Sequence, residues 1–113
     1  MALPTRLWVQ AHVARFAAQG KSVVVVRRGD PHRGVVMVKL HLLGEGFRVV
    51  TQRRNLDGAL QWDIVLGESP VPEADADSYI ERQIGYDPDL WVVEFELRPD
   101  DADAIEVFRG PVS

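Results

Sequence analysis

Two strongly apolar runs in the first half of the chain are separated by one polar segment. Four consecutive valines occupy positions 23–26, and a second run extends from Val35 to Leu43. β-Branched side chains keep few χ1 rotamers and pack well on a pleated surface, so both runs predict β-strands. An unbroken apolar run is typical of a strand covered on both faces. The polar segment 27–34 predicts the turn of a β-hairpin, around which the other elements are arranged.

Three further segments alternate between apolar and polar positions, which is the pattern of strands with one buried face. They span residues 47–52, 60–66 and 90–97, and Trp91 lies on the apolar face of the last one. In the segment 47–52 the alternation predicts one face in water. Short turns link the first four strands, and strands joined by such turns pair antiparallel because parallel neighbours need long crossovers. The sequence therefore predicts an antiparallel meander.

Apolar residues recur at helical spacing in two segments. In residues 5–19, Thr5 is placed to cap the first turn and Gly20 to end the helix. Residues 73–84 carry the second apolar stripe, with acidic residues in the first turn, where the helix dipole favours negative charge. Gly85 is expected to end this helix.

The predicted order of elements is α-β-β-β-β-α-β. An α+β fold of two layers satisfies these patterns, with both helices packed on one face of a mainly antiparallel sheet of about five strands. A single domain is expected over residues 1–98. Residues 99–113 form an acidic tail. This tail is expected to be poorly ordered unless Ile105, Val107 and Phe108 dock as one more short element.

The chain of 113 residues contains no cysteine. Disulfides, thiolate metal sites and cysteine nucleophiles are therefore excluded, and a reducing cytoplasmic location is permitted. The N-terminal segment has no apolar core of signal-peptide type, and no stretch of about 18 uninterrupted apolar residues occurs. We expect a soluble cytoplasmic protein without a membrane span or a bound cofactor.

The formal net charge of −4 hides an uneven distribution of charge along the chain. Residues 1–56 contain ten Lys or Arg and two Asp or Glu, a balance of +8. Residues 57–113 contain three Arg and fifteen Asp or Glu, a balance of −12. Either the two halves interleave in one fold and neutralise each other, or separate basic and acidic faces attract a charged partner or a second copy of the chain.

The densest cluster of positive charge lies in the polar turn, at Arg27, Arg28 and Arg33. Gly29 and Gly34 free the backbone there, and exposed amides beside guanidinium groups can hold an anion. The segment is not a P-loop, because neither a Gly-Lys-Ser/Thr motif nor a helix follows it. The three arginines are therefore candidate anion-binding residues, and a plain charged turn is the alternative.

Metal binding has little support in the sequence. The acidic pairs Asp75–Asp77 and Asp101–Asp103 lack the glycine and the distal glutamate of a calcium-binding loop. The three histidines are too scattered for a linear zinc motif. We therefore expect no metal site.

Two other functions depend on the same basic region. Asp30 and His32 form a possible acid–base pair, with Arg28 as an electrophile, and would be the centre of a small enzyme. A nucleic acid or a small anion would instead bind a basic surface made by the cations from Arg27 to Arg54, if they share one face.

Three motifs resemble those of a known family. They are Tyr79-Ile80-Glu81-Arg82, Asp87-Pro88-Asp89-Leu90-Trp91-Val92-Val93-Glu94 and the Arg28-Gly29-Asp30 turn. With the surrounding residues 6–97, they resemble a family of short alphaproteobacterial proteins grouped as domain of unknown function 1491. The resemblance implies a bacterial cytoplasmic setting, and it brings no activity, cofactor or site residue to transfer.

These observations favour a non-enzymatic α+β binding or interaction module that engages a protein partner or a second copy of itself. Binding of a nucleic acid or small anion by the 27–54 surface is the first alternative. A small enzyme built on Arg28, Asp30 and His32 is the second. A concave pocket that converges on the arginine turn would favour the alternatives, whereas a flat apolar edge or a symmetric contact would favour the module.

Overall fold

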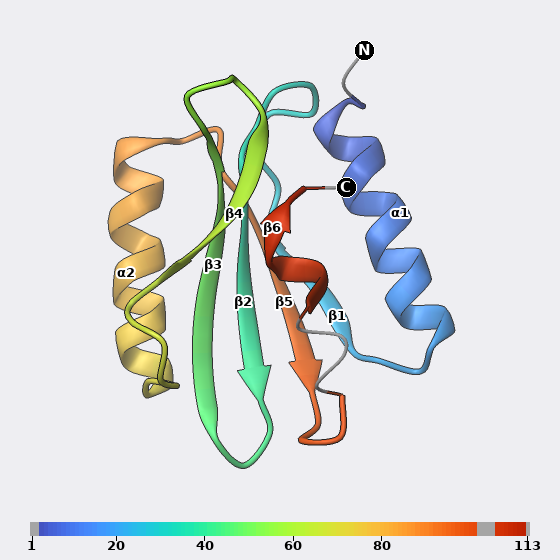
Figure 1. Ribbon diagram of the computed structural model, residues 1–113, viewed down its shortest axis with the longest axis vertical. Coiled ribbons are helices and arrows are strands. Elements are labelled where there is room, and N and C mark those ends of the chain that lie inside the picture. The colour runs from blue at the N-terminus through green and yellow to red at the C-terminus, as the bar shows by residue number, and fades with distance from the viewer. Residues whose placement is uncertain (1–2, 102–105, 113) are drawn as a thin grey trace.

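The computed structural model describes residues 3–101 and 106–112, and this part of the chain forms two α-helices, one short 3₁₀-helix and six strands (Figure 1). The elements are α1 (Thr5–Ala18), β1 (Val23–Arg27), β2 (Val36–Leu42), β3 (Gly46–Arg54), β4 (Leu60–Val65), α2 (Glu73–Tyr86), β5 (Trp91–Leu97), η1 (Glu106–Phe108) and β6 (Gly110–Pro111). The order agrees with the predicted one, to which η1 and β6 are added. Neither α-helix in the described ranges has the length and apolar character needed to cross a membrane.

The strands form one sheet in the order β1-β5-β2-β3-β4-β6. β2, β3 and β4 make the antiparallel meander that their short turns predict. β5 lies between β1 and β2, antiparallel to β1 and parallel to β2. The α+β class and the mainly antiparallel sheet are thus confirmed. The predicted hairpin of β1 and β2 is wrong, because residues 28–35 form a crossover loop that passes the start of β5.

β1 lies at the edge of the sheet, and its four valines differ in exposure. Val24 and Val26 are 55% and 56% exposed, whereas Val23 and Val25 pack against the core. β1 is therefore covered on one face only. β2, by contrast, is covered on both faces, since residues 36–40 are all buried. An apolar run does not distinguish an edge strand from a central one, because the whole sheet decides how many neighbours a strand has.

The two helices cover opposite faces of the sheet (Figure 1). Phe16 of α1 packs with one set of strand side chains, and Ile80 of α2 packs with the other set. Because successive strand residues point to opposite faces, Val38 belongs to the α1 side and Met37 to the α2 side. The fold thus has three layers, not the two layers that the patterns predict. The face of β3 that alternation predicts to be in water is also covered, and Val50 is buried there.

The helix ends differ from the prediction in detail. Pro4 occupies the capping position of α1, and Thr5 is the first helical residue. The hydroxyl of Thr5 donates a hydrogen bond to the carbonyl oxygen of Gly34 at 2.8 Å, which ties the start of α1 to the crossover loop. Gly20 follows the end of α1 as predicted, with a φ of 77°. α2 continues past Gly85, the residue predicted to end it.

The segment after β5 adds to the core through η1. Phe108 is 1% exposed, and its ring centroid lies 5.1 Å from that of Phe95 and 5.3 Å from that of Trp62. β6 then pairs with the outer edge of β4. For residues 106–112 the structure thus has the further short element that the sequence allowed, while Ile105 lies outside the described residues.

Candidate functional site

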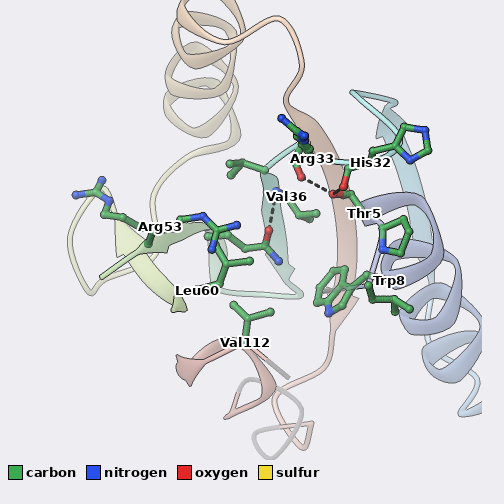
Figure 2. A pocket seen from close by; sticks show the side chains of 14 residues that line it. Thr5, Trp8, His32, Arg33, Val36, Arg53, Leu60 and Val112 are labelled. Carbon is green, nitrogen blue, oxygen red and sulfur yellow. Dashed lines mark hydrogen bonds between the residues drawn. The ribbon is translucent and has the colours of Figure 1, made fainter. Parts of the chain in front are cut away.

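A cleft of about 900 Å³ opens between the start of α1, the crossover loop, the end of β3 and the start of β4 (Figure 2). We call it the arginine-rimmed cleft. Segments far apart in the sequence line it, including the N-terminal segment up to Trp8, the crossover loop, the end of β3, Leu60 and Val112. Ligand pockets of proteins have volumes of roughly 300–1,000 Å³. The cleft therefore has the size of a small-molecule site.

Apolar side chains form the floor of the cleft. Val36, at the start of β2, is 1% exposed. The backbone N–H of Val112 donates to the carbonyl oxygen of Leu60 at 3.0 Å, which holds the C-terminal segment beside β4. Trp8 closes the side toward α1 (Figure 2), and the ring of His12 stacks on it with centroids 3.8 Å apart. The floor is thus built from side chains whose positions are fixed by packing.

His12 lies one helical turn after Trp8 in α1, and its ring stacks on the indole. Burial lowers the pKa of His12, and this effect exceeds that of the hydrogen bond from its Nδ1 to the carbonyl oxygen of Trp8, at 2.9 Å, which raises the pKa. The ring is therefore held neutral at physiological pH. His12 is not among the residues that line the cleft. Its ring packs against the indole of Trp8.

Positive side chains surround the opening. Arg33 lines the cleft from the crossover loop, with His32 beside it in the sequence. Arg53 and Arg54 line it from the end of β3. Among the described residues that form the wall, there is no Asp and no Glu. Unbalanced positive charge in a hollow attracts anions, because the low-dielectric walls focus the field.

The three arginines differ in how far their guanidinium groups are engaged. Nη2 of Arg53 lies 3.2 Å from the carboxylate of Asp63, and Figure 2 shows this side chain extending away from the centre of the cleft. Nη1 of Arg54 donates to the carbonyl oxygen of Gly58 at 2.7 Å. The exposed guanidinium of Arg33 makes no hydrogen bond or ion pair with the residues that the structure describes. Arg33 can therefore turn toward a bound anion, and Arg54 keeps further donors.

Gln52 is a wall residue that sequence reasoning missed. It is 8% exposed and lies on the same face of β3 as Arg54. Its Oε1 accepts a hydrogen bond from the backbone N–H of Val36 at 3.0 Å (Figure 2). Alternation along β3 predicts a wet position here, and only the packing of the α1 layer on this face buries the side chain. No local signal could have found it.

The arginines that the sequence places in one turn do not surround one site. Nη2 of Arg27 donates to the carbonyl oxygen of Pro88 at 2.9 Å, so this side chain ties β1 to the segment before β5. Arg28 is exposed and is not among the residues that line the cleft. Of the three candidates, Arg33 is the one that the fold brings to the cleft.

The glycines of the crossover loop allow close packing against another segment. A Cβ atom added to Gly29 or to Gly34 would collide with the carbonyl oxygen of Asp89. The backbone N–H of Asp30 donates to that same oxygen at 2.9 Å. Nε1 of Trp91 donates in turn to the carbonyl oxygen of Asp30 at 2.7 Å. Two motifs singled out in the sequence, the Arg-Gly-Asp turn and the segment before β5, are thus parts of one interlocked structure.

Asp30 and His32, considered as an acid–base pair, are joined through the backbone. Oδ1 of Asp30 accepts hydrogen bonds from the backbone N–H of Arg33 at 2.8 Å and of His32 at 2.9 Å. These two hydrogen bonds hold the pKa of Asp30 below its usual range. The carboxylate therefore shapes the loop that carries Arg33, and it is a weak base. The exposed side chain of His32 lies at the cleft.

A charge cluster around the buried Lys39 lies on the α2 side of the sheet, on the opposite face from the cleft floor. Nζ of Lys39, a residue 6% exposed, is 2.8 Å from Glu73, 2.7 Å from Asp77 and 3.5 Å from Glu94. Burial lowers the pKa of Lys39, but the hydrogen bonds to Asp77 and Glu73 and the charge of Glu94 outweigh burial and raise the pKa above its usual value. The cluster fastens α2 to the sheet and removes Lys39 from any basic surface.

The acidic pairs considered as metal ligands have other partners. Asp77 is bound to Lys39, and Asp75 is exposed in the first turn of α2. Asp101 accepts a backbone hydrogen bond within its own turn. Asp103 lies outside the described residues. Within the described ranges, no three His, Asp or Glu side chains are grouped closely enough to hold a metal ion.

Comparison with known proteins places the chain in a family. A family model described as "Protein of unknown function (DUF1491)" matches residues 3–104. The crystal structure of a DUF1491 family protein from Caulobacter crescentus is similar with 34% identity and a TM-score of 0.75, over 85% of this chain and 89% of that chain. The NMR structure of a DUF1491 family protein from the same organism is similar with 37% identity and a TM-score of 0.78, over 88% and 89%.

A more distant structure shares the fold. The solution structure of protein Atu0922 from A. tumefaciens has 23% identity and a TM-score of 0.73, over 86% of this chain and 87% of that chain. No curated protein gives a significant match. The family match spans most of the chain and includes both the crossover loop and the segment before β5, which interlock in the structure. The chain therefore belongs to the DUF1491 family.

Proposed function

We propose that this protein is a non-enzymatic binding module that holds an organic anion in the arginine-rimmed cleft. The observation that carries the proposal is the charge of the cleft wall. Arg33, Arg54 and His32 line it without an Asp or Glu among the described wall residues, in a chain whose net charge is −4, while Arg53 at its edge is paired with Asp63. A local excess of positive charge in an acidic protein, placed around an apolar hollow, favours anions over neutral ligands.

The ligand that suits this wall has an apolar body and an anionic group. The body would rest on the floor, against Val36 and Leu60. The anionic group would lie at the opening, where Arg33 and Arg54 approach from two different segments. The planar guanidinium group binds carboxylate or phosphate through two parallel hydrogen bonds. An amphipathic anion uses both parts of the cleft at once.

The titratable groups support binding without catalysis. General acid–base and nucleophilic reactions need a reactive group with a positioned partner. Among the described wall residues, His32 is the histidine, and none is an Asp, Glu or Cys. The carboxylate of Asp30 is occupied by backbone N–H groups, and the hydroxyl of Thr5 donates to the carbonyl oxygen of Gly34. None of these described groups forms a nucleophile–base pair at the cleft.

A small anion suits the distribution of cations better than a nucleic acid does. The basic surface considered from Arg27 to Arg54 includes Lys39, which is buried among carboxylates. Arg27 is engaged by the carbonyl oxygen of Pro88. The cations therefore do not form the continuous stripe that a phosphate backbone requires.

A cytoplasmic location, which the absence of cysteine permits, is part of this proposal.

The test uses anilinonaphthalene sulfonate, a dye whose fluorescence rises at apolar sites, and phenylnaphthylamine, its neutral counterpart. We expect the sulfonate dye to bind with an affinity that falls as salt rises. Arg33→Gln should weaken it about threefold, since an ionic contact at an exposed rim contributes roughly 0.2–1 kcal/mol. Arg28→Gln is the matched control, because Arg28 belongs to the same loop and lies outside the cleft. Neither change should affect the neutral dye.

The double variant Arg33→Gln, Arg54→Gln gives the stronger test. Thermal melting is measured alongside, because Arg54 also donates to the carbonyl oxygen of Gly58. If the folded double variant binds the sulfonate dye as tightly as the wild type, the proposal is wrong. If Arg28→Gln lowers the affinity for the sulfonate dye as much as Arg33→Gln does, the dye does not bind in this cleft.

A further inference from the structure

The orientation of the Gln52 side-chain amide is set by the backbone of β2. The backbone N–H of Val36 can only donate, so the atom that faces it at 3.0 Å is the carbonyl oxygen Oε1 of Gln52. The Nε2 group is thereby left with two N–H donors and no capacity to accept. Among the described residues, no acceptor is bound to Nε2.

These donors belong to a side chain that is more than nine-tenths buried at the cleft wall. Gln52 is 8% exposed and lines the cleft. It pairs across the sheet with Trp62, whose side chain belongs to the core on the α1 side, the same side as the cleft floor. Nε2 is not among the buried side-chain atoms that lack a hydrogen-bond partner, so it stays open to the cleft, where water or a ligand atom can accept from it. A fixed pair of donors in a ligand-sized hollow therefore favours a ligand atom that accepts.

We infer that Gln52 selects among organic anions and favours those whose apolar body carries a hydrogen-bond acceptor, such as a ring nitrogen or a carbonyl oxygen. This inference rests on the proposed function, in which the arginines of the rim hold the anionic group. Gln52 and Arg54 are two residues apart on one face of β3, about 7 Å along the strand. A bicyclic body with the acceptor at one end and the anionic group at the other spans this separation.

Naphthalene carboxylate and the quinoline carboxylates form a matched set of probes. They have the same shape and one carboxylate each, but in quinoline a nitrogen that accepts a hydrogen bond replaces one CH of the ring. The positional isomers are titrated one by one, since only an isomer whose nitrogen faces Nε2 gains the contact. We expect one isomer to bind about fivefold more tightly than naphthalene carboxylate, the gain of one hydrogen bond. With that isomer, the side-chain amide resonance of Gln52 should shift more than with naphthalene carboxylate.

Gln52→Glu isolates the role of the donors. The new carboxylate still accepts from the backbone N–H of Val36 but offers no N–H to a ligand. The negative charge of the new carboxylate lowers the affinity of all carboxylate probes alike. The readout is therefore the ratio of the quinoline carboxylate affinity to the naphthalene carboxylate affinity. This ratio should fall to about one. Gln61→Glu is the control with the same charge change, because Gln61 is exposed on β4 and does not line the cleft. It should keep the ratio.

The outcomes separate this inference from the function on which it rests. If the probes bind, respond to Arg33→Gln and show the same ratio in wild type and Gln52→Glu, the inference is wrong and the proposed function stands. If no probe shifts the backbone resonances of Val36 and Leu60, both are wrong. A ratio that falls in Gln52→Glu and persists in Gln61→Glu supports both.

Discussion

Nε1 of Trp91 donates a hydrogen bond to the carbonyl oxygen of Asp30, and the two atoms are 2.7 Å apart. Trp91 begins β5 and is 4% exposed, whereas Asp30 lies in the crossover loop. The same oxygen accepts from the backbone N–H of Gly34 at 3.2 Å. A core side chain thus fixes the loop that brings Arg33 to the cleft, so stability and the candidate site are coupled at this contact.

Trp91→Ala is expected to unfold the protein or nearly so. Truncation of a large buried aromatic side chain costs about 3–5 kcal/mol, and a small domain has a total stability of roughly 5–15 kcal/mol. Trp91→Phe keeps most of the ring and loses the hydrogen bond, so a smaller cost of about 1–3 kcal/mol is expected. Urea denaturation followed by circular dichroism measures both. A wild-type midpoint for Trp91→Ala would show that Trp91 is not a core anchor.

Gly29→Ala should destabilise the fold by about 1–3 kcal/mol, the usual cost of overpacking. Its Cβ atom would meet backbone atoms of Asp89 and Leu90, which cannot rotate away as a side chain could. Gly85→Ala is the control, because a Cβ atom at this helical position meets nothing within 4 Å. Alanine in a helix is favoured over glycine by about 0.5–1 kcal/mol, so this variant should gain stability. Thermal melting of the two variants compares them, and equal shifts would contradict the interlocked packing.

Lys39 predicts a loss of stability at alkaline pH. Burial alone would lower its pKa, but the hydrogen bonds to Asp77 and Glu73 and the charge of Glu94 raise it above the ordinary value of 10.5. A group whose pKa is higher in the folded state stabilises the fold fully below its unfolded pKa, and this contribution is lost as the pH rises through the folded pKa. The wild type should therefore lose stability above about pH 10.5, the ordinary value of the group. Lys39→Met should show a shallower decline in denaturation curves taken at rising pH, and identical slopes would refute the assignment.

Positive side chains of the first half of the chain meet carboxylates of the second half within the fold. Lys21, Lys39 and Arg53 all form such ion pairs. The two halves thus interleave, which is one of the two arrangements considered from the charge distribution. Reversal of the exposed Arg28 and Arg33 to Glu should therefore leave a single sedimenting species at low and at high salt. Wild-type association that appears only at low salt, and that the reversal abolishes, would point instead to a charged docking face.

Local patterns were sufficient for most of the elements. The alternation in β4 and β5 and the helical stripe of α1 each predict one buried face, because the period of a side-chain pattern depends only on the geometry of the element itself. In β5 the face of Val92, which is 1% exposed, is covered as well, but the alternation correctly marks the face of Trp91. Trp91 shows this, since its predicted burial on β5 is confirmed. The positive charge of the crossover loop is equally local, so Arg33 could be named as a candidate, although Arg27 and Arg28 could not be separated from it.

The sequence by itself therefore determined the elements, their order and the α+β class, since each depends on residues close together in the chain. Only the tertiary structure decided that β5 separates β1 from β2 and that α1 and α2 lie on opposite faces. It also decided that Trp8, Gln52, Leu60 and Val112 meet at one cleft. The physical reason is that strand pairing and layer order minimise the exposed apolar surface of all the elements together. That total depends on the whole chain, so no short stretch of sequence can predict it.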